Sequence, residues 1–129
     1  MDPRHAAEIE NALPALLDHF YARVRQDPAL GPVFNDGVED WDHHLATLAD
    51  FWSSVMLTSG RYKGHPVLAH QKHAARITPE MFGRWLELWG ETTNQMVSPE
   101  VAAAMQAKAA RIGQSLDLAL HFRLPKAGG

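Results

Sequence analysis

The sequence DWDHHLATLADFWSSV, residues 40–55, holds the strongest structural signal in the chain. Its apolar and aromatic side chains recur three, four and seven residues apart, a spacing that places them on one face of an α-helix. These side chains are Trp41, His44, Leu45, Leu48, Phe51, Trp52 and Val55. The helix is expected to begin at a cap on Glu39 or Asp40, to run to about Thr58, and to end before Gly60.

Helical spacing continues toward the N-terminus. The expected elements there are a short helix from Asp2-Pro3 to about Asn11, a second helix from Pro14 to about Asp27, and turns over the proline-bracketed residues 28–35. A proline in the first turn of a helix costs no hydrogen bond, which is why both helices are placed to open at one. The second helix carries one apolar stripe: Leu13, Leu16, Leu17, Phe20, Tyr21 and Val24.

Three further helices are expected after a glycine-containing loop over residues 59–65. They run from Pro66 to about Ala75, from the Thr78-Pro79 pair onward, and from the Ser98-Pro99 pair onward. The inward side chains of the last two are Phe82, Trp85, Leu86, Trp89 and Met96, then Val101, Met105, Ile112, Leu116 and Leu120. Strand and hairpin patterns are nearly absent. The sequence therefore predicts an all-α fold of about six crossing helices.

Composition narrows the class of protein. The chain has 129 residues, no cysteine and a formal net charge of −3, and residues 1–129 fit a single domain. Without cysteine there are no disulfides, thiolate zinc sites or iron–sulfur clusters. The acidic balance argues against nucleic-acid binding, and no apolar run approaches the roughly 18 residues of a membrane helix. Because the N-terminus also lacks the pattern of a secretory signal, we expect a cytoplasmic protein.

Histidine and tryptophan are abundant, at 8 and 4 residues, and their ring N–H groups need partners when buried. His44 lies on an apolar stripe, where it is either a hydrogen-bonded core residue or the wall of a cavity. His70 and His73 stand one helical turn apart, but zinc needs three or four protein ligands and no third one lies at helical spacing nearby. A single histidine suffices for haem iron, because haem brings four nitrogens of its own.

A haem group would also need a flat apolar slot. The chain offers side chains of the required kind: Phe20, Phe34, Leu48, Phe51, Trp52, Tyr62 and Trp85. For any one of them, a place in the hydrophobic core is the simpler interpretation. However, Tyr21, His44 and Trp85 each carry a hydrogen-bond donor on an inner helix face, and three such donors are costly in a plain apolar core.

Four runs of sequence carry a joint pattern: FYARVRQDPALGPVFN (20–35), DWDHHLATLADFWSSV (40–55), GRYKGHPVLAH (60–70) and ITPEMFGRWLELW (77–89). They combine W-x-x-H-x-x-x-x-x-x-F-W with a Tyr-x-Gly-x-Pro-x-x-x-His run that ends at His70. This combination resembles the group III truncated haemoglobins. The resemblance is close from Asp18 to Trp89 and looser over the rest of the chain.

The resemblance implies a globin-like fold, a truncated two-over-two helical sandwich around b-type haem. It implies His70 as the iron ligand, and we expect its other ring nitrogen to donate to a nearby carbonyl. The distal polar residues would be Tyr21, His44 and Trp85. The lining would comprise Phe20, Phe34, Leu48, Phe51 and Trp52, with Tyr62 completing the candidate set.

One segment departs from the family pattern, because the stretch from His70 to Trp85 is a residue longer. In the loop that this affects, Arg76 or His73 could reach a haem propionate; the alternative, which is favoured, is that both are solvated surface residues. The tail over residues 124–129 is expected to be disordered.

The function implied is a haem protein that binds dioxygen and other diatomic ligands at the iron. Nitric oxide dioxygenation and peroxidase-like turnover are candidate chemistries, and either would need an external electron donor. Two alternatives remain open. In one, His44 is a second iron ligand and the protein is a six-coordinate redox or haem-handling protein. In the other, the chain is a haem-free helical interaction module.

Overall fold

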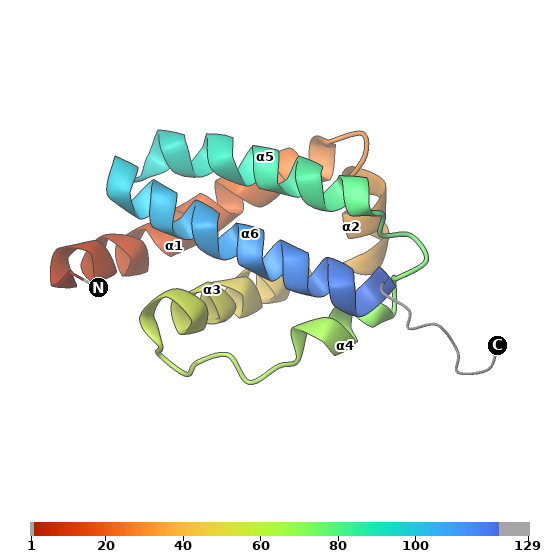
Figure 1. The fold of residues 1–129 in the computed structure, drawn as a ribbon, viewed down its shortest axis with the longest axis horizontal. Helices are drawn as coiled ribbons and strands as arrows, with labels where there is room; N and C mark the ends of the chain where they lie inside the picture. Colours follow the sequence, from red (N-terminus) through yellow and green to blue (C-terminus); the bar gives the residue numbers. More distant parts are fainter. Residues whose placement is uncertain (1, 122–129) are drawn as a thin grey trace, which may run out of the picture.

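The computed structural model of the chain describes residues 2–121, and all regular structure in that part is α-helical (Figure 1). The helices are α1 (Pro3–Gln26), α2 (Gly31–Gly37), α3 (Trp41–Leu57), α4 (Pro66–Gln71), α5 (Pro79–Met96) and α6 (Pro99–His121). The all-α prediction is confirmed. The tail over residues 124–129, for which disorder was expected, lies outside the described residues.

The four long helices form two pairs. Helices α5 and α6 run antiparallel and side by side, while α1 packs on α3, and α1 also packs on α5 to join the pairs (Figure 1). The short helices are added at the edges, α2 against α1 and α4 against α6. This is the expected two-over-two arrangement. Among the described residues, no helix has the length and apolar character needed to cross a membrane.

The first helix differs from its prediction. Helix α1 is continuous, and Pro14 lies inside it instead of opening a second helix. The proline nitrogen has no hydrogen to donate to the carbonyl of Glu10, so one helical bond is missing. The continuous apolar stripe outweighs that loss, because it is buried before and after the proline, at Ile9, Leu13, Leu16 and Leu17.

Two predicted helix starts are confirmed by their caps. The Asp40 side chain accepts a hydrogen bond from the backbone N–H of His43 at the start of α3. The Thr78 side chain accepts one from the N–H of Met81 at the start of α5. Both bonds satisfy amide hydrogens that the first turn of a helix leaves unpaired. The segment predicted as helical turns, residues 28–35, overlaps the short helix α2.

The short helix α4 ends earlier than predicted, at Gln71 instead of Ala75. Beyond it the backbone continues in turns, in which the N–H of His73 bonds to the carbonyl of His70 and that of Arg76 bonds to His73. These three-residue bonds are tighter than α-helical ones and rarely extend over long runs. Residues 72–76 therefore form a compact connection that directly follows α4.

The hydrophobic core lies where α1 faces α5, α6 and one residue of α3. Its most deeply buried side chains, at most 1% exposed, are Ile9, Leu16, Leu17, Phe20, Val24, Trp52, Trp89, Val101, Ala102, Met105 and Ala109. One inward prediction is wrong, because Met96 at the end of α5 is 38% exposed. It is the last residue of its helix, next to the turn that leads into α6.

Candidate functional site

A second set of apolar side chains is only partly buried. These side chains pack against the core from four helices, at Phe34, Trp41, Leu45, Leu48, Phe51, Val55, Trp85, Leu86 and Ile112. Most of them belong to α3, whose inner face is fully buried only at Trp52 and Ser53. Apolar and aromatic side chains that stay partly exposed as a group are typical of ligand-binding surfaces.

Tyr21 is the centre of an aromatic cluster at this site. Its ring centroid lies 4.8 Å from Phe20, 5.7 Å from Phe34, 5.9 Å from Trp41 and 6.1 Å from His44. The cluster therefore draws its members from α1, α2 and α3. Two of the three predicted distal donors, Tyr21 and His44, are neighbours in it.

The third predicted donor, Trp85 on α5, reaches the same tyrosine. Burial raises the pKa of Tyr21 to about 12, and a hydrogen bond from Trp85 to the tyrosine side chain opposes part of that rise. The Trp85 ring also lies 6.0 Å from Phe20, the sequence neighbour of Tyr21. At neutral pH Tyr21 is thus an un-ionised phenol whose O–H can serve as a donor.

His44 is half-buried on the inner face of α3. Burial lowers the pKa of His44, and the charges of His70 and His43 act in the same direction. At pH 7 the imidazole is therefore mostly neutral, with one N–H and one free lone pair. The influence of His70 also means that the imidazoles of α3 and α4 are close enough to interact across the site.

His70 has the hydrogen bond that was predicted from the sequence. Its Nδ1 lies 2.7 Å from the carbonyl oxygen of Pro66. A carbonyl oxygen only accepts, so Nδ1 carries the hydrogen and Nε2 of the neutral ring keeps a lone pair free for a metal. Within residues 2–121 no three His, Asp or Glu side chains gather to hold a metal ion by protein ligands alone. The setting of His70 suits an iron atom that arrives with other ligands, as in haem.

The predicted lining residues fall into two groups. Three are partly buried: Phe34, Leu48 and Phe51. The other two, Phe20 and Trp52, are 0% and 1% exposed and pack on Trp89, with ring centroids 4.8 Å and 4.5 Å away. Phe20 and Trp52 are thus core side chains, and they support the partly buried ones from behind.

Tyr62 is held in place by the loop that follows α3. Its ring packs edge-on against Phe51 with centroids 5.2 Å apart, and its backbone N–H donates to the Ser54 hydroxyl. Arg61 fastens the same loop to α1 through an ion pair with Glu10. Burial raises the pKa of Tyr62, so this phenol too is un-ionised at neutral pH.

His73 and Arg76 both contact α2. The His73 ring packs closely on Gly37, where an added Cβ would lie 3.3 Å from Nε2. Arg76 forms an ion pair of 2.9 Å with Asp36. These side-chain contacts fasten the connection after α4 to α2.

Trp41 was expected on the inner face of α3 but was not included among the predicted site residues. Its ring lies 5.4 Å from His44 and 5.9 Å from Tyr21, and the guanidinium of Arg25 covers it at 4.6 Å. Its position one turn before His44 could have signalled this contact. No sequence signal pointed to Arg25.

Comparisons with known proteins agree with the fold. The model of the bacterial-like globin family matches residues 8–114. A curated group 3 truncated hemoglobin, ctb, from Campylobacter jejuni is 32% identical over 126 residues, which is 93% of this chain and 94% of that protein. The crystal structure of a group III truncated hemoglobin from the same organism superposes with a TM-score of 0.77 at 29% identity, covering 91% of this chain and 94% of the other.

Proposed function

Because the chain belongs to the bacterial-like globins, a family that binds ligands through haem, we propose that it is a b-type haem protein that reversibly binds dioxygen and other diatomic gases. One observation carries the proposal: His70, with Nδ1 fixed on Pro66, stands close to a cluster of neutral hydrogen-bond donors around Tyr21. Bound haem would supply an iron atom that accepts a gas molecule as ligand.

The proximal role falls to His70. The hydrogen bond from Nδ1 to the Pro66 carbonyl fixes the tautomer and the ring orientation, so that Nε2 can hold the iron. The partly buried side chains of Phe34, Leu48 and Phe51 would cover the apolar faces of the porphyrin.

The distal role falls to Tyr21, His44 and Trp85. Each side chain is neutral at pH 7. Tyr21 and His44 each carry a hydrogen that can be donated to a polar ligand, and Trp85 supports them through its hydrogen bond to the Tyr21 side chain. Donors in a site from which water is largely excluded hold a polarised oxygen atom more firmly than the same donors in water. Firm binding suits oxidation chemistry or sensing better than delivery, and we include nitric oxide dioxygenase and peroxidase-like activity, with an external electron donor, in the proposal.

A second candidate rests on the proximity of His44 to His70. If His44 supplied a second ligand to the iron, the protein would be six-coordinate without any gas and would suit electron transfer or haem handling. The ferrous absorption spectrum separates the two states, because five-coordinate and six-coordinate haem have different visible bands. The single-domain organisation and the cytoplasmic location stay predictions from the sequence.

Titration of the purified chain with hemin tests the proposed function. We expect a Soret band that saturates at one haem per chain and shifts when carbon monoxide is added to the reduced protein. Leu48→Arg places a charge among the partly buried side chains and should weaken hemin binding by about tenfold or more. Leu118→Arg is the matched control, since Leu118 is 57% exposed on α6, and should bind hemin normally. Absence of saturable binding by the unmodified chain would refute the proposal.

A further inference from the structure

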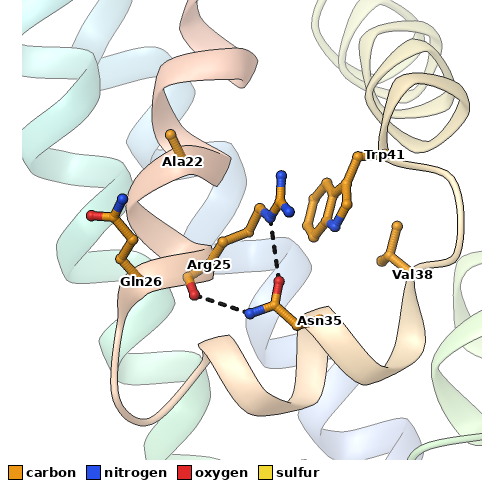
Figure 2. Close-up of a pocket in the computed structure, with 6 residues that line it drawn as sticks. All are labelled: Ala22, Arg25, Gln26, Asn35, Val38 and Trp41. Carbon is orange, nitrogen blue, oxygen red and sulfur yellow. Dashed lines mark hydrogen bonds between the residues drawn. The ribbon is translucent and has the colours of Figure 1, made fainter.

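A groove of about 540 Å³ opens on the surface where α1, α2 and the start of α3 meet (Figure 2). Its lining residues are Ala22, Arg25, Gln26, Asn35, Val38 and Trp41. Only Trp41 among them belongs to the aromatic cluster around Tyr21 described above. The groove nevertheless lies next to that cluster, because Ala22 directly follows Tyr21 in the sequence and Trp41 contacts it.

Trp41 contacts both the distal donors and the groove. Its ring packs against His44 and Tyr21, with centroids 5.4 Å and 5.9 Å away. The same ring lines the groove beneath the guanidinium of Arg25, which lies 4.6 Å from the ring centroid (Figure 2). No other groove-lining side chain makes ring contacts with both donors among the described residues.

Arg25 is held over the indole. Its Nε donates to Oδ1 of Asn35 at 3.3 Å, and Nδ2 of Asn35 donates back to the carbonyl oxygen of Arg25 at 3.1 Å (Figure 2). The amide of Asn35 thus engages both the backbone and the side chain of one residue. This clamp, together with the attraction between a cation and an aromatic face, keeps the guanidinium stacked on Trp41.

We propose that Trp41, closed by the stacked Arg25, is a gate through which diatomic ligands pass between the groove and the Tyr21–His44 pair. The inference rests on the proposed function, since it concerns ligands of the haem iron. A gate acts on the movement of the ligand toward the iron and not on the ligand once it is bound there. Removing it lowers the barrier for entry and exit equally, so both rates rise by one factor while the affinity stays constant. Loss of a distal hydrogen bond would instead change mainly the rate of dissociation.

The first test measures carbon monoxide association by flash photolysis and dissociation by ligand displacement in the haem-loaded protein. Trp41→Ala should raise both rates together, by a factor on the order of ten. Arg25→Ala should raise both by a smaller common factor and leaves the indole in place, so it tests the gate even if Trp41→Ala fails to fold. Arg111→Ala removes an exposed arginine from α6 and should change neither rate. Unchanged rates in the first two variants, or a change in dissociation alone, would overturn the gate.

The second test uses a porphyrin that contains no iron. In protein loaded with zinc protoporphyrin, dioxygen quenches the excited triplet state without coordinating to the metal, so the quenching rate reports access alone. Quenching should be faster in Trp41→Ala and Arg25→Ala than in the unmodified chain and in Arg111→Ala. Equal quenching in all four would contradict the gate and leave the proposed function standing. A chain that takes up neither haem nor zinc porphyrin would contradict the proposed function itself.

Discussion

Leu16 on α1 and Leu48 on α3 occupy equivalent places in two amphipathic helices, yet their surroundings differ. Leu16 is 0% exposed in the hydrophobic core, whereas Leu48 is only partly buried. Both positions follow from the same helical spacing in the sequence. Periodicity therefore tells which face of a helix turns inward, but not whether protein or a ligand will cover it.

The tryptophans show the same contrast in their hydrogen bonds. The indole N–H of Trp89 donates to the carbonyl oxygen of Met105 inside the core, at 3.2 Å, and its ring stacks on Trp52. Trp85 lies one turn earlier on α5, is partly exposed, and directs its N–H to the side chain of Tyr21. The N–H of Trp89 is thus satisfied by a backbone carbonyl and stabilises the core, whereas the N–H of Trp85 belongs to a group of side-chain donors.

The sharpest test of this contrast compares two leucine truncations in the haem-free chain. Leu16→Ala should lower the free energy of unfolding by about 2–5 kcal/mol, because it leaves a cavity in a closely packed core. Leu48→Ala should cost about 1 kcal/mol, since the leucine is already partly in contact with water. Urea denaturation followed by circular dichroism measures both. Equal losses would show that the two regions are packed alike.

A second prediction concerns the donors. Tyr21→Phe should speed dioxygen dissociation from the haem-loaded protein by about tenfold to a hundredfold, because a hydrogen bond to a strongly polarised oxygen contributes about 1.5–3 kcal/mol. Trp85→Phe should act in the same direction. Carbon monoxide, which is less polar when bound, should dissociate at nearly the original rate. Stopped-flow replacement measures both gases, and similar effects on both would point to sterics.

A third prediction concerns the packed region at the end of α1. Burial alone would raise the pKa of Asp27, but hydrogen bonds from Arg84 and from the N–H groups of Leu30 and Ala29 hold it below its ordinary value. Asp27→Asn should therefore lower the free energy of unfolding at pH 7 by about 1–3 kcal/mol. Asp36→Asn, which alters an exposed ion pair, is the matched control and should have a much smaller effect.

The same aspartate sets a pH dependence. A carboxyl whose pKa is depressed in the folded state stabilises the fold fully above its unfolded pKa of about 3.9, and that contribution is lost as the pH falls through the folded value. The difference in unfolding free energy between the unmodified chain and Asp27→Asn should hence shrink below about pH 4. A constant difference down to pH 2 would contradict the assignment.

Much of the fold could be predicted because helix signals are local. Caps at Asp40 and Thr78 and the stripes of α1 and α3 depend on residues within a few turns of one another. The continuity of α1 could not be predicted, because Pro14 is a local signal for a helix start that burial against other helices overrides. The early end of α4 likewise reflects contacts with α2 that are distant in sequence.

The candidate site was predictable to the extent that its residues lie on inner faces. His70 and its bond to Pro66, four residues earlier, are local features of one helix. In contrast, the stacking of Arg25 on Trp41 joins α1 to α3 and depends on how those helices cross. Sequence spacing also did not separate Phe20 and Trp52, which are core residues, from the partly buried Phe51.

The central claim, that the partly buried side of the molecule holds haem on His70, is tested most directly by removing that imidazole. His70→Gly should lose the ferrous spectrum of the haem-loaded protein and retain haem weakly, and free imidazole should restore much of the spectrum by filling the space. His73→Gly, one turn later and packed on Gly37, should keep a normal spectrum. The opposite result, with haem lost from His73→Gly and retained normally by His70→Gly, would contradict the account.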